Sequence, residues 1–266
     1  MPSRVRRHPR NKRKAQQVRP PHERELLRIC GLAAVRALFD RDPGRVERLF
    51  FEPSLREELD ASCQELARAH KPYRQVGSAE LARVAGTVLH GGAVAIARPR
   101  PLADLDPKAA WAWAQDGKPL LVLDGVGNPH NLGAIARSAA FFGLARIILA
   151  DRPDQALRSD AAYRAAEGGL EHVALYRASL HAALHELRHA YHIVGTSLAG
   201  GSAVMNPTGD RPVALILGNE KTGLQAATLA RCDEVMRIPG SGPVQSLNVA
   251  SAAAILIYLL TRSPAG

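Results

Sequence analysis

The segment Leu120-Leu-Val-Leu-Asp-Gly-Val-Gly-Asn-Pro-His-Asn131 joins a short apolar run to a loop with two glycines and a proline. A continuous apolar run of this length is typical of a strand buried on both faces of a parallel sheet. Residues 132–142 follow with the apolar pattern of a helix. The same succession of strand, loop and helix returns down to residue 261, and it predicts an α/β fold built on a parallel sheet.

Several such strands and helices are expected in the C-terminal part of the chain. The predicted strands cover residues 120–123, 145–150, 192–195, 212–217 and 234–238, and the predicted helices cover residues 132–142, 180–190, 224–232 and 247–261. Ligands of such sheets bind at the carboxyl ends of the strands. The loops after Leu123, Leu217 and Ile238 are therefore the candidate site.

A smaller α/β domain is expected ahead of this sheet, over residues 23–97. Residues 46–51 (VERLFF) are predicted as a strand. A helix is predicted after it, because apolar residues recur at helical spacing at Leu55, Leu59, Cys63 and Leu66.

The two domains are expected to be joined by a linker over residues 98–117, which leaves residues 118–266 as the second domain. Three prolines fall among residues 98–107 and predict an extended chain. Trp111 and Trp113 would share one face of a strand but not of a helix.

The composition excludes several classes of protein. Hydrophobic residues make up 46% of the chain and charged residues 23%, as in ordinary globular proteins. No apolar stretch reaches the ~18 residues of a spanning helix, and the N-terminus lacks the apolar core of a secretory signal. The three cysteines lie far apart without a CxxC pair, which argues against disulfides or a cysteine metal site and favours the reducing cytoplasm.

Most of the formal net charge of +10 sits in residues 1–22, which hold eight Lys and Arg and no Asp or Glu. This basic tail is expected to be disordered, since it offers little apolar surface to bury. Such arms bind polyanions by releasing counterions, so RNA is the favoured partner over a membrane surface.

The first two candidate loops place polar side chains next to glycine or proline. In the first, Asn131 is predicted to cap the helix that carries Arg137. In the second, Gly218 follows a strand directly and would allow close approach to a ligand, and Glu220 stands between glycines.

The third loop, residues 239–246, is rich in proline and glycine and delivers Ser246 as the predicted cap of the last helix. Asn248 lies early in that apolar helix. Its amide requires a hydrogen-bond partner if it is buried.

A rival motif is His185-Glu-Leu-Arg-His189, which matches the HExxH pattern of zinc hydrolases that use His185, Glu186 and His189. Arg188 places a cation inside the motif, where it would oppose Zn²⁺. Histidines are also frequent nearby, so a solvent-exposed helix face is the simpler interpretation.

Read together, the three loops resemble the motifs of the SpoU family of RNA ribose 2′-O-methyltransferases, in the SPOUT superfamily. The resemblance covers residues 118–262, and residues 24–97 resemble the small RNA-substrate-binding domain that often precedes it. It is carried by Asn131-Leu-Gly-Ala-Ile-Ala-Arg137, by Leu217-Gly-Asn-Glu-Lys-Thr-Gly-Leu224, and by Ile238-Pro239 followed by Ser246-Leu-Asn-Val249.

The resemblance implies a trefoil-knotted C-terminal domain that binds S-adenosylmethionine and methylates structured rRNA or tRNA without a metal. It also implies a homodimer in which each active site is completed by the partner. The cofactor contacts implied by motif position are Gly218, Ile238 and Leu247. The catalytic set implied in the same way is Arg137, Asn131, Glu220, Ser246 and Asn248.

Two chemical hypotheses follow for this set. A guanidinium is an awkward base because it holds its proton firmly, so we expect Arg137 to grip a phosphate and orient the 2′-hydroxyl rather than to accept a proton. Glu220 is expected to order Asn131 and its loop rather than to act as a base.

The motifs also depart from the family pattern. Asn128 stands where an acidic residue is common, and Lys221-Thr222 stand where small residues are common. Both departures bear on substrate or cofactor handling, and the alternative of a catalytically silent RNA-binding SPOUT protein remains open.

Overall fold

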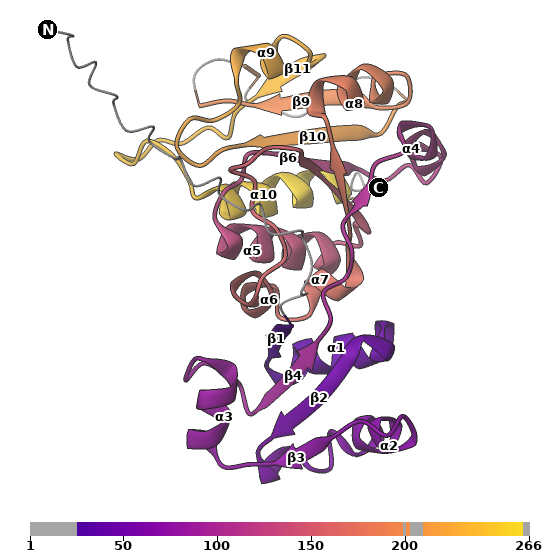
Figure 1. The fold of residues 1–266 in the computed structure, drawn as a ribbon. Coiled ribbons are helices and arrows are strands. Elements are labelled where there is room, and N and C mark those ends of the chain that lie inside the picture. The colour runs from indigo at the N-terminus through magenta and orange to yellow at the C-terminus, as the bar shows by residue number, and fades with distance from the viewer. Residues whose placement is uncertain (1–25, 199–200, 203–209, 263–266) are drawn as a thin grey trace, which may run out of the picture.

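A computed structural model of the chain describes residues 26–198, 201–202 and 210–262. The basic tail of residues 1–22 lies outside the described residues. The described chain forms two α/β domains, one around a four-stranded sheet and one around a seven-stranded sheet (Figure 1). Among the described residues, no helix combines the length and apolar character needed to cross a bilayer.

The N-terminal domain has the strand order β1-β4-β2-β3, in which only β2 and β3 are parallel. Its strands are β1 (Leu27–Cys30), β2 (Val46–Phe51), β3 (Tyr73–Gln75) and β4 (Ala93–Ala97). Its helices are α1 (Leu32–Arg41), α2 (Asp60–Arg68) and α3 (Ser78–Ala85), with short 3-10 turns η1 (Pro43–Arg45) and η2 (Pro53–Leu55). The strand predicted over residues 46–51 is confirmed as β2.

The C-terminal sheet has the order β11-β9-β10-β6-β7-β8-β5, and all its pairs are parallel, which confirms the prediction of a parallel sheet. Its strands are β5 (Ala103–Asp104), β6 (Leu120–Asp124), β7 (Arg146–Ala150), β8 (Ala174–Ala178), β9 (His192–Thr196), β10 (Val213–Gly218) and β11 (Glu234–Met236). The threading that a trefoil knot requires stays a prediction.

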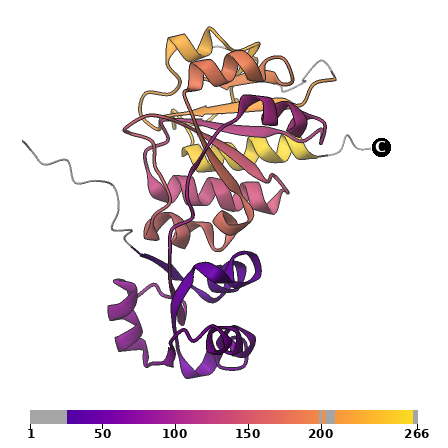
Figure 2. The ribbon, with the colours of Figure 1, turned by 45° about the vertical axis from the view of Figure 1, so that its right-hand side comes forward.

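Helices cover both faces of this sheet. They are α4 (Pro107–Ala114), α5 (Pro129–Phe141), α6 (Asp160–Ala166), α7 (Gly169–His172), α8 (Leu180–Leu187), α9 (Ala226–Leu229) and α10 (Val249–Thr261). On one face α10, yellow in Figure 2, packs against α5 and β10. On the other face, α4 and α8 form a separate apolar cluster with the sheet.

The apolar run of β6 is explained by these two layers. Leu121 and Leu123 point into the cluster with α5 and α10, whereas Leu120 and Val122 point into the cluster with α4 and α8. Successive side chains of a strand alternate between faces, so a strand covered on both sides is apolar at every position.

The predicted linker over residues 98–117 is wrong in part. Residues 103–104 form β5, which pairs with β8 at the sheet edge, and Asp106 caps α4 by accepting a hydrogen bond from the Lys108 N–H at 3.0 Å. Trp111 and Trp113 therefore lie on a helix, not a strand. The Trp113 ring packs against Tyr176, with ring centroids 4.9 Å apart.

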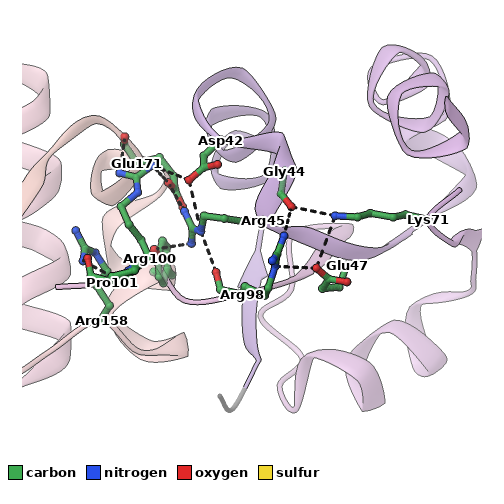
Figure 3. A network of polar contacts seen from close by, with 11 residues as sticks. Asp42, Gly44, Arg45, Glu47, Lys71, Arg98, Arg100, Pro101, Arg158 and Glu171 are labelled. Atoms are coloured by element: carbon green, nitrogen blue, oxygen red, sulfur yellow. Dashed lines mark hydrogen bonds and ion pairs between the residues drawn. The ribbon is translucent and has the colours of Figure 1, made fainter. Parts of the chain in front are cut away.

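The two domains meet where α1 packs against α7 and the turn before it and where β1 packs against α6. A network of polar side chains joins the domains there (Figure 3). The carboxylate of Glu171, which is fully buried, accepts hydrogen bonds from both Arg45 and Arg100, at 2.8 and 2.9 Å to the same oxygen. Gly168 has φ +95, and a Cβ there would lie 3.1 Å from the Cβ of Ala37. The close approach of α1 therefore depends on a glycine at this turn.

Candidate active site

The first two candidate loops lie side by side because β6 and β10 are paired. Gly218, the last residue of β10, is in register with Asp124, the last residue of β6. The side-chain amide of Asn219 donates a hydrogen bond to the Gly125 carbonyl at 2.7 Å and so joins the two loops. A Cβ on Gly218 would lie 2.4 Å from the backbone carbon of Gly223, so the second loop folds directly over its strand only with glycine here.

Glu220 organises the first loop. Its carboxylate accepts hydrogen bonds from the Asn131 side-chain amide at 2.7 Å and from the N–H groups of Gly127 and Asn128, both at 3.1 Å. All its described partners are donors, so the carboxylate is held in its ionised form. This is the geometry expected of a residue that orders Asn131 rather than one that removes a proton.

The pKa of Glu220 agrees with this arrangement. Burial alone would raise it, but hydrogen bonds from Asn131 and from backbone N–H groups bring the pKa below its ordinary value of 4.5. A lowered pKa means that these bonds stabilise the fold above the ordinary value and are lost as the pH falls through the folded-state pKa.

We therefore predict that Glu220→Gln destabilises the protein by a constant amount at neutral pH and that the difference shrinks only below a pH of about 4.5. Urea unfolding of both proteins over a series of pH values checks this. If the difference disappears near pH 6, the carboxylate is not held ionised as described.

The third loop joins the same cluster through Asn248. Its amide donates to the Asn131 side-chain oxygen at 3.0 Å, so Asn131 lies between Glu220 and Asn248. Motifs more than 80 residues apart thus meet in one chain of hydrogen bonds. Asn248 is exposed, so the sequence did not require a partner for its amide, but the amide has one in Asn131.

Both predicted helix caps are wrong by a few residues. α5 begins at Pro129 and is capped by Asn128, whose side-chain oxygen accepts from the His130 N–H at 2.9 Å. α10 begins at Val249 and is capped by Asn248, not by Ser246. Asn131 is instead free to serve as a bridging amide. An amide at Asn128 performs the capping that a carboxylate would, so this departure from the family pattern keeps the helix start intact.

The backbone of the third loop is open to a ligand. No backbone hydrogen bond ties residues 239–247 to any other part of the chain that the structure describes. Val244 and Leu247 are exposed, with 79% and 51% of their surface accessible, while Ile238 packs against the core. Unpaired backbone groups beside apolar side chains suit a nucleoside with polar edges and apolar faces, so this loop fits S-adenosylmethionine. Ser246 is also exposed, and among the described residues its hydroxyl makes no hydrogen bond.

Arg137 lies apart from this cluster. It is six residues beyond Asn131 on α5, ~9 Å along the axis and on another face of the helix. Its described polar contact is an ion pair with Glu167 at 2.7 Å, and both side chains are about half exposed (55% and 56%). Within one chain, the structure therefore brings Asn131, Glu220 and Asn248 together and leaves Arg137 and Ser246 outside their hydrogen-bond network.

Two buried residues that the sequence did not indicate support the first loop. The side chain of Gln155 accepts from the Gly125 N–H at 2.9 Å and donates to the Val126 carbonyl at 3.1 Å. Asp124 pairs with Arg152 at 2.9 Å and accepts from the Thr228 hydroxyl at 3.0 Å. No local pattern distinguishes these residues from exposed polar ones, because their partners lie far along the chain.

The HExxH segment has a different role. His189 lies beyond the end of α8, and its ring packs against Trp111 with centroids 5.9 Å apart. In the described part of the chain, no three His, Cys, Asp or Glu side chains are grouped as metal ligands. The geometry therefore gives no support to a zinc hydrolase.

Comparisons with known proteins agree with the arrangement of these loops. The model of the SpoU rRNA methylase family matches residues 118–258, and the model for RNA 2′-O ribose methyltransferase substrate binding matches residues 28–103. The chain is 32% identical over 244 residues to a 23S rRNA (guanosine-2′-O-)-methyltransferase, RlmB, of Acinetobacter baylyi, a match that covers 89% of this chain and 97% of that protein.

Solved structures extend the likeness to the fold. An RNA 2′-O ribose methyltransferase matches with a TM-score of 0.69 and 27% identity, over 89% of this chain and 88% of that one. An AdoMet-bound rRNA methyltransferase from Sinorhizobium meliloti has the same fold, with a TM-score of 0.70 and 24% identity over 88% and 86% of the two chains. With its three motifs joined at the ends of parallel strands, the chain belongs to the SpoU rRNA methylase family.

Proposed function

We propose that this protein transfers the methyl group of S-adenosylmethionine to a ribose 2′-hydroxyl of rRNA or tRNA. The observation that carries the proposal is the joining of three SpoU motifs through Glu220, Asn131 and Asn248 beside the open third loop. The family match over both domains supports the reaction and the class of substrate.

The chain's own residues would supply mainly positioning. S-adenosylmethionine, when bound, would supply a methyl group on a sulfonium: the ribose oxygen bonds to the methyl carbon as the carbon–sulfur bond breaks, the neutral thioether leaves, and the hydroxyl proton passes to solvent. The open backbone of residues 239–247, with Gly218, Ile238 and Leu247, would hold it. Glu220 and Asn131 keep the neighbouring loops in a fixed geometry, and fixed geometry is the main requirement of a displacement reaction.

Arg137 would act on the RNA. A guanidinium presents five N–H donors and binds phosphate oxygens in pairs, so it can fix the backbone beside the target ribose and polarise the hydroxyl. A guanidinium that forms an ion pair with Glu167 at 2.7 Å is suited to holding an anion rather than to accepting a proton.

We further propose a homodimer in which the partner's third loop faces Arg137. Arg137 lies outside the polar cluster of its own chain, which a second copy would explain. The outer face of α10 carries the exposed side chains of Ile255 and Tyr258, an apolar surface suited to a protein partner. The cytoplasmic location expected from the sequence stays a prediction.

A methylation assay tests the proposed function. Purified protein, tritiated S-adenosylmethionine and RNA from cells that lack the gene should yield labelled RNA, and the label should map to a 2′-O-methylated ribose. Cofactor binding and RNA binding without transfer would instead indicate a silent RNA-binding member of the family.

Removal of residues 1–22 should weaken RNA binding and flatten its dependence on salt. The tail carries eight basic side chains, and each phosphate contact with single-stranded RNA contributes about 0.7 to the slope of log affinity against log salt. Binding of the full chain and the truncated chain over a salt series measures this. An unchanged slope would show that the tail does not contact RNA.

A further inference from the structure

Arg137 lines a pocket at the junction of the two domains. The pocket has a volume of about 360 Å³ and is lined by α5, by residues 166–169 and by α1 of the N-terminal domain. This volume lies within the range of ~300–1,000 Å³ that small-molecule sites occupy. The pocket is separate from the polar cluster at Glu220, so the proposed cofactor loops do not account for it.

The N-terminal domain supplies one wall of this pocket. Ala33 and Ala37, one helical turn apart, present small side chains from α1. A Cβ on Gly169 would lie 2.7 Å from the Cα of Arg137, so the turn before α7 is pressed against α5 at this residue. The buried contact between Arg45 and Glu171 holds α1 against the same turn. The wall is therefore fixed with respect to Arg137.

The described lining of the pocket holds one guanidinium, that of Arg137, which can donate to a phosphate as well as to its ion-pair partner Glu167. Among the described residues, Glu167 contacts one nitrogen of the Arg137 guanidinium, Nη1, and leaves the other N–H groups available. Exposed ion pairs are weak, so an incoming phosphate can bind the Arg137 guanidinium together with Glu167 or displace the Glu167 carboxylate from it. His172 is exposed at the same pocket and adds a donor, and the alanines of α1 leave room for the chain of the RNA.

We propose that a backbone phosphate of the substrate RNA enters this pocket between α1 and α5, so that the N-terminal domain forms half of the binding site for the nucleotide next to the target ribose. This inference rests on the proposed function. In this arrangement Ala33 borders the bound RNA. An alanine has no polar group, so no sequence motif would indicate this role.

Substitution at Ala33 tests the proposal. Ala33 is exposed on a helix, and glutamate and lysine have similar helix propensities, so both variants should fold. Ala33→Glu should weaken binding of RNA from a strain that lacks the gene by about tenfold, because it places a negative charge opposite the phosphate. Ala33→Lys should strengthen it. Ala61→Glu, at an exposed alanine of α2, makes the same charge change away from the pocket and should have no effect.

Filter binding of the RNA gives a readout independent of methyl transfer, and calorimetry with S-adenosylmethionine should give equal affinities for all variants. Opposite effects of glutamate and lysine at position 33, without an effect at position 61, support the pocket. Equal binding of the two Ala33 variants, or an equal loss in Ala61→Glu, overturns it. Absence of methyl transfer by the unaltered protein would instead overturn the proposed function. The RNA-binding comparison of the variants would still decide whether the pocket binds RNA, because it does not depend on methyl transfer.

Discussion

Replacing Arg137 with alanine is expected to lower the rate of methyl transfer by about 10²–10³-fold, the loss typical when one group that stabilises developing charge is removed. The physical reason is that the 2′-hydroxyl is a weak nucleophile at neutral pH and depends on a nearby cation to hold and polarise it. The affinity for S-adenosylmethionine should change little, because the backbone of residues 239–247 would hold the cofactor, whereas Arg137 would act on the RNA. Single-turnover rates and calorimetric cofactor binding measure the two effects separately.

A matched control removes the same charge elsewhere. Arg68, exposed in the last turn of α2, is replaced by alanine, and this variant should retain the unaltered rate. Arg137→Lys should restore little, since a single ammonium cannot reproduce the paired donors of a guanidinium. Full activity of Arg137→Ala would show that the cation acts elsewhere in the chain.

The sheet could be predicted because its signal is local. In β6, β7 and β10 every residue or nearly every residue is apolar, and this follows directly from the burial of both faces. The same reasoning failed where strands are short or exposed. β5 has two residues and β8 is only partly buried, so neither presents an apolar run. The prolines near α4 predict an extended linker, but Pro107 stands at the first position of a helix, where its missing N–H costs nothing.

The helix caps show a second limit. Asn128, Asn131, Ser246 and Asn248 are all residue types that cap helices, so composition alone could not choose among them. Tertiary contacts decided the choice. Asn131 bridges Glu220 and Asn248, and only the folded chain brings these two residues within reach of one amide.

The surroundings of Arg137 could not be predicted at all. They depend on Ala33, Glu167 and Gly168, of which the first lies in another domain. Their side chains carry no pattern that points to RNA. The family resemblance implies a catalytic role for Arg137, but the pocket in which this residue lies is a property of how the two domains meet.

The largest expected loss of stability comes from breaking the contact that joins the domains. Glu171 is fully buried, and Arg45, only 8% exposed, donates to both of its carboxylate oxygens at 2.8 and 3.0 Å. Glu171→Ala removes the carboxylate hydrogen-bonded to the buried Arg45 guanidinium and leaves it, among the described carboxylates, only the more distant Asp42, at 3.9 Å. We expect a cost of about 3–5 kcal/mol in the free energy of unfolding. Urea unfolding measures it. Glu80→Ala, which breaks an exposed pair with Arg74, should cost about 1 kcal/mol or less.

The double variant Arg45→Met with Glu171→Leu decides what the buried pair is for. Apolar side chains of similar size can replace a buried ion pair without loss of stability, so the double variant should regain part of what Glu171→Ala loses. The part not regained includes the ion pair of Arg100 with Glu171, which both variants lack. If the pair also sets the angle between the domains, the regained stability should not restore RNA binding. The reason is that Arg45 makes directional hydrogen bonds to Glu171, to Tyr163 and to the Arg98 carbonyl, and a methionine packed on a leucine makes none. A double variant that is stable and binds RNA as tightly as the unaltered protein would show that burial alone positions α1 beside Arg137.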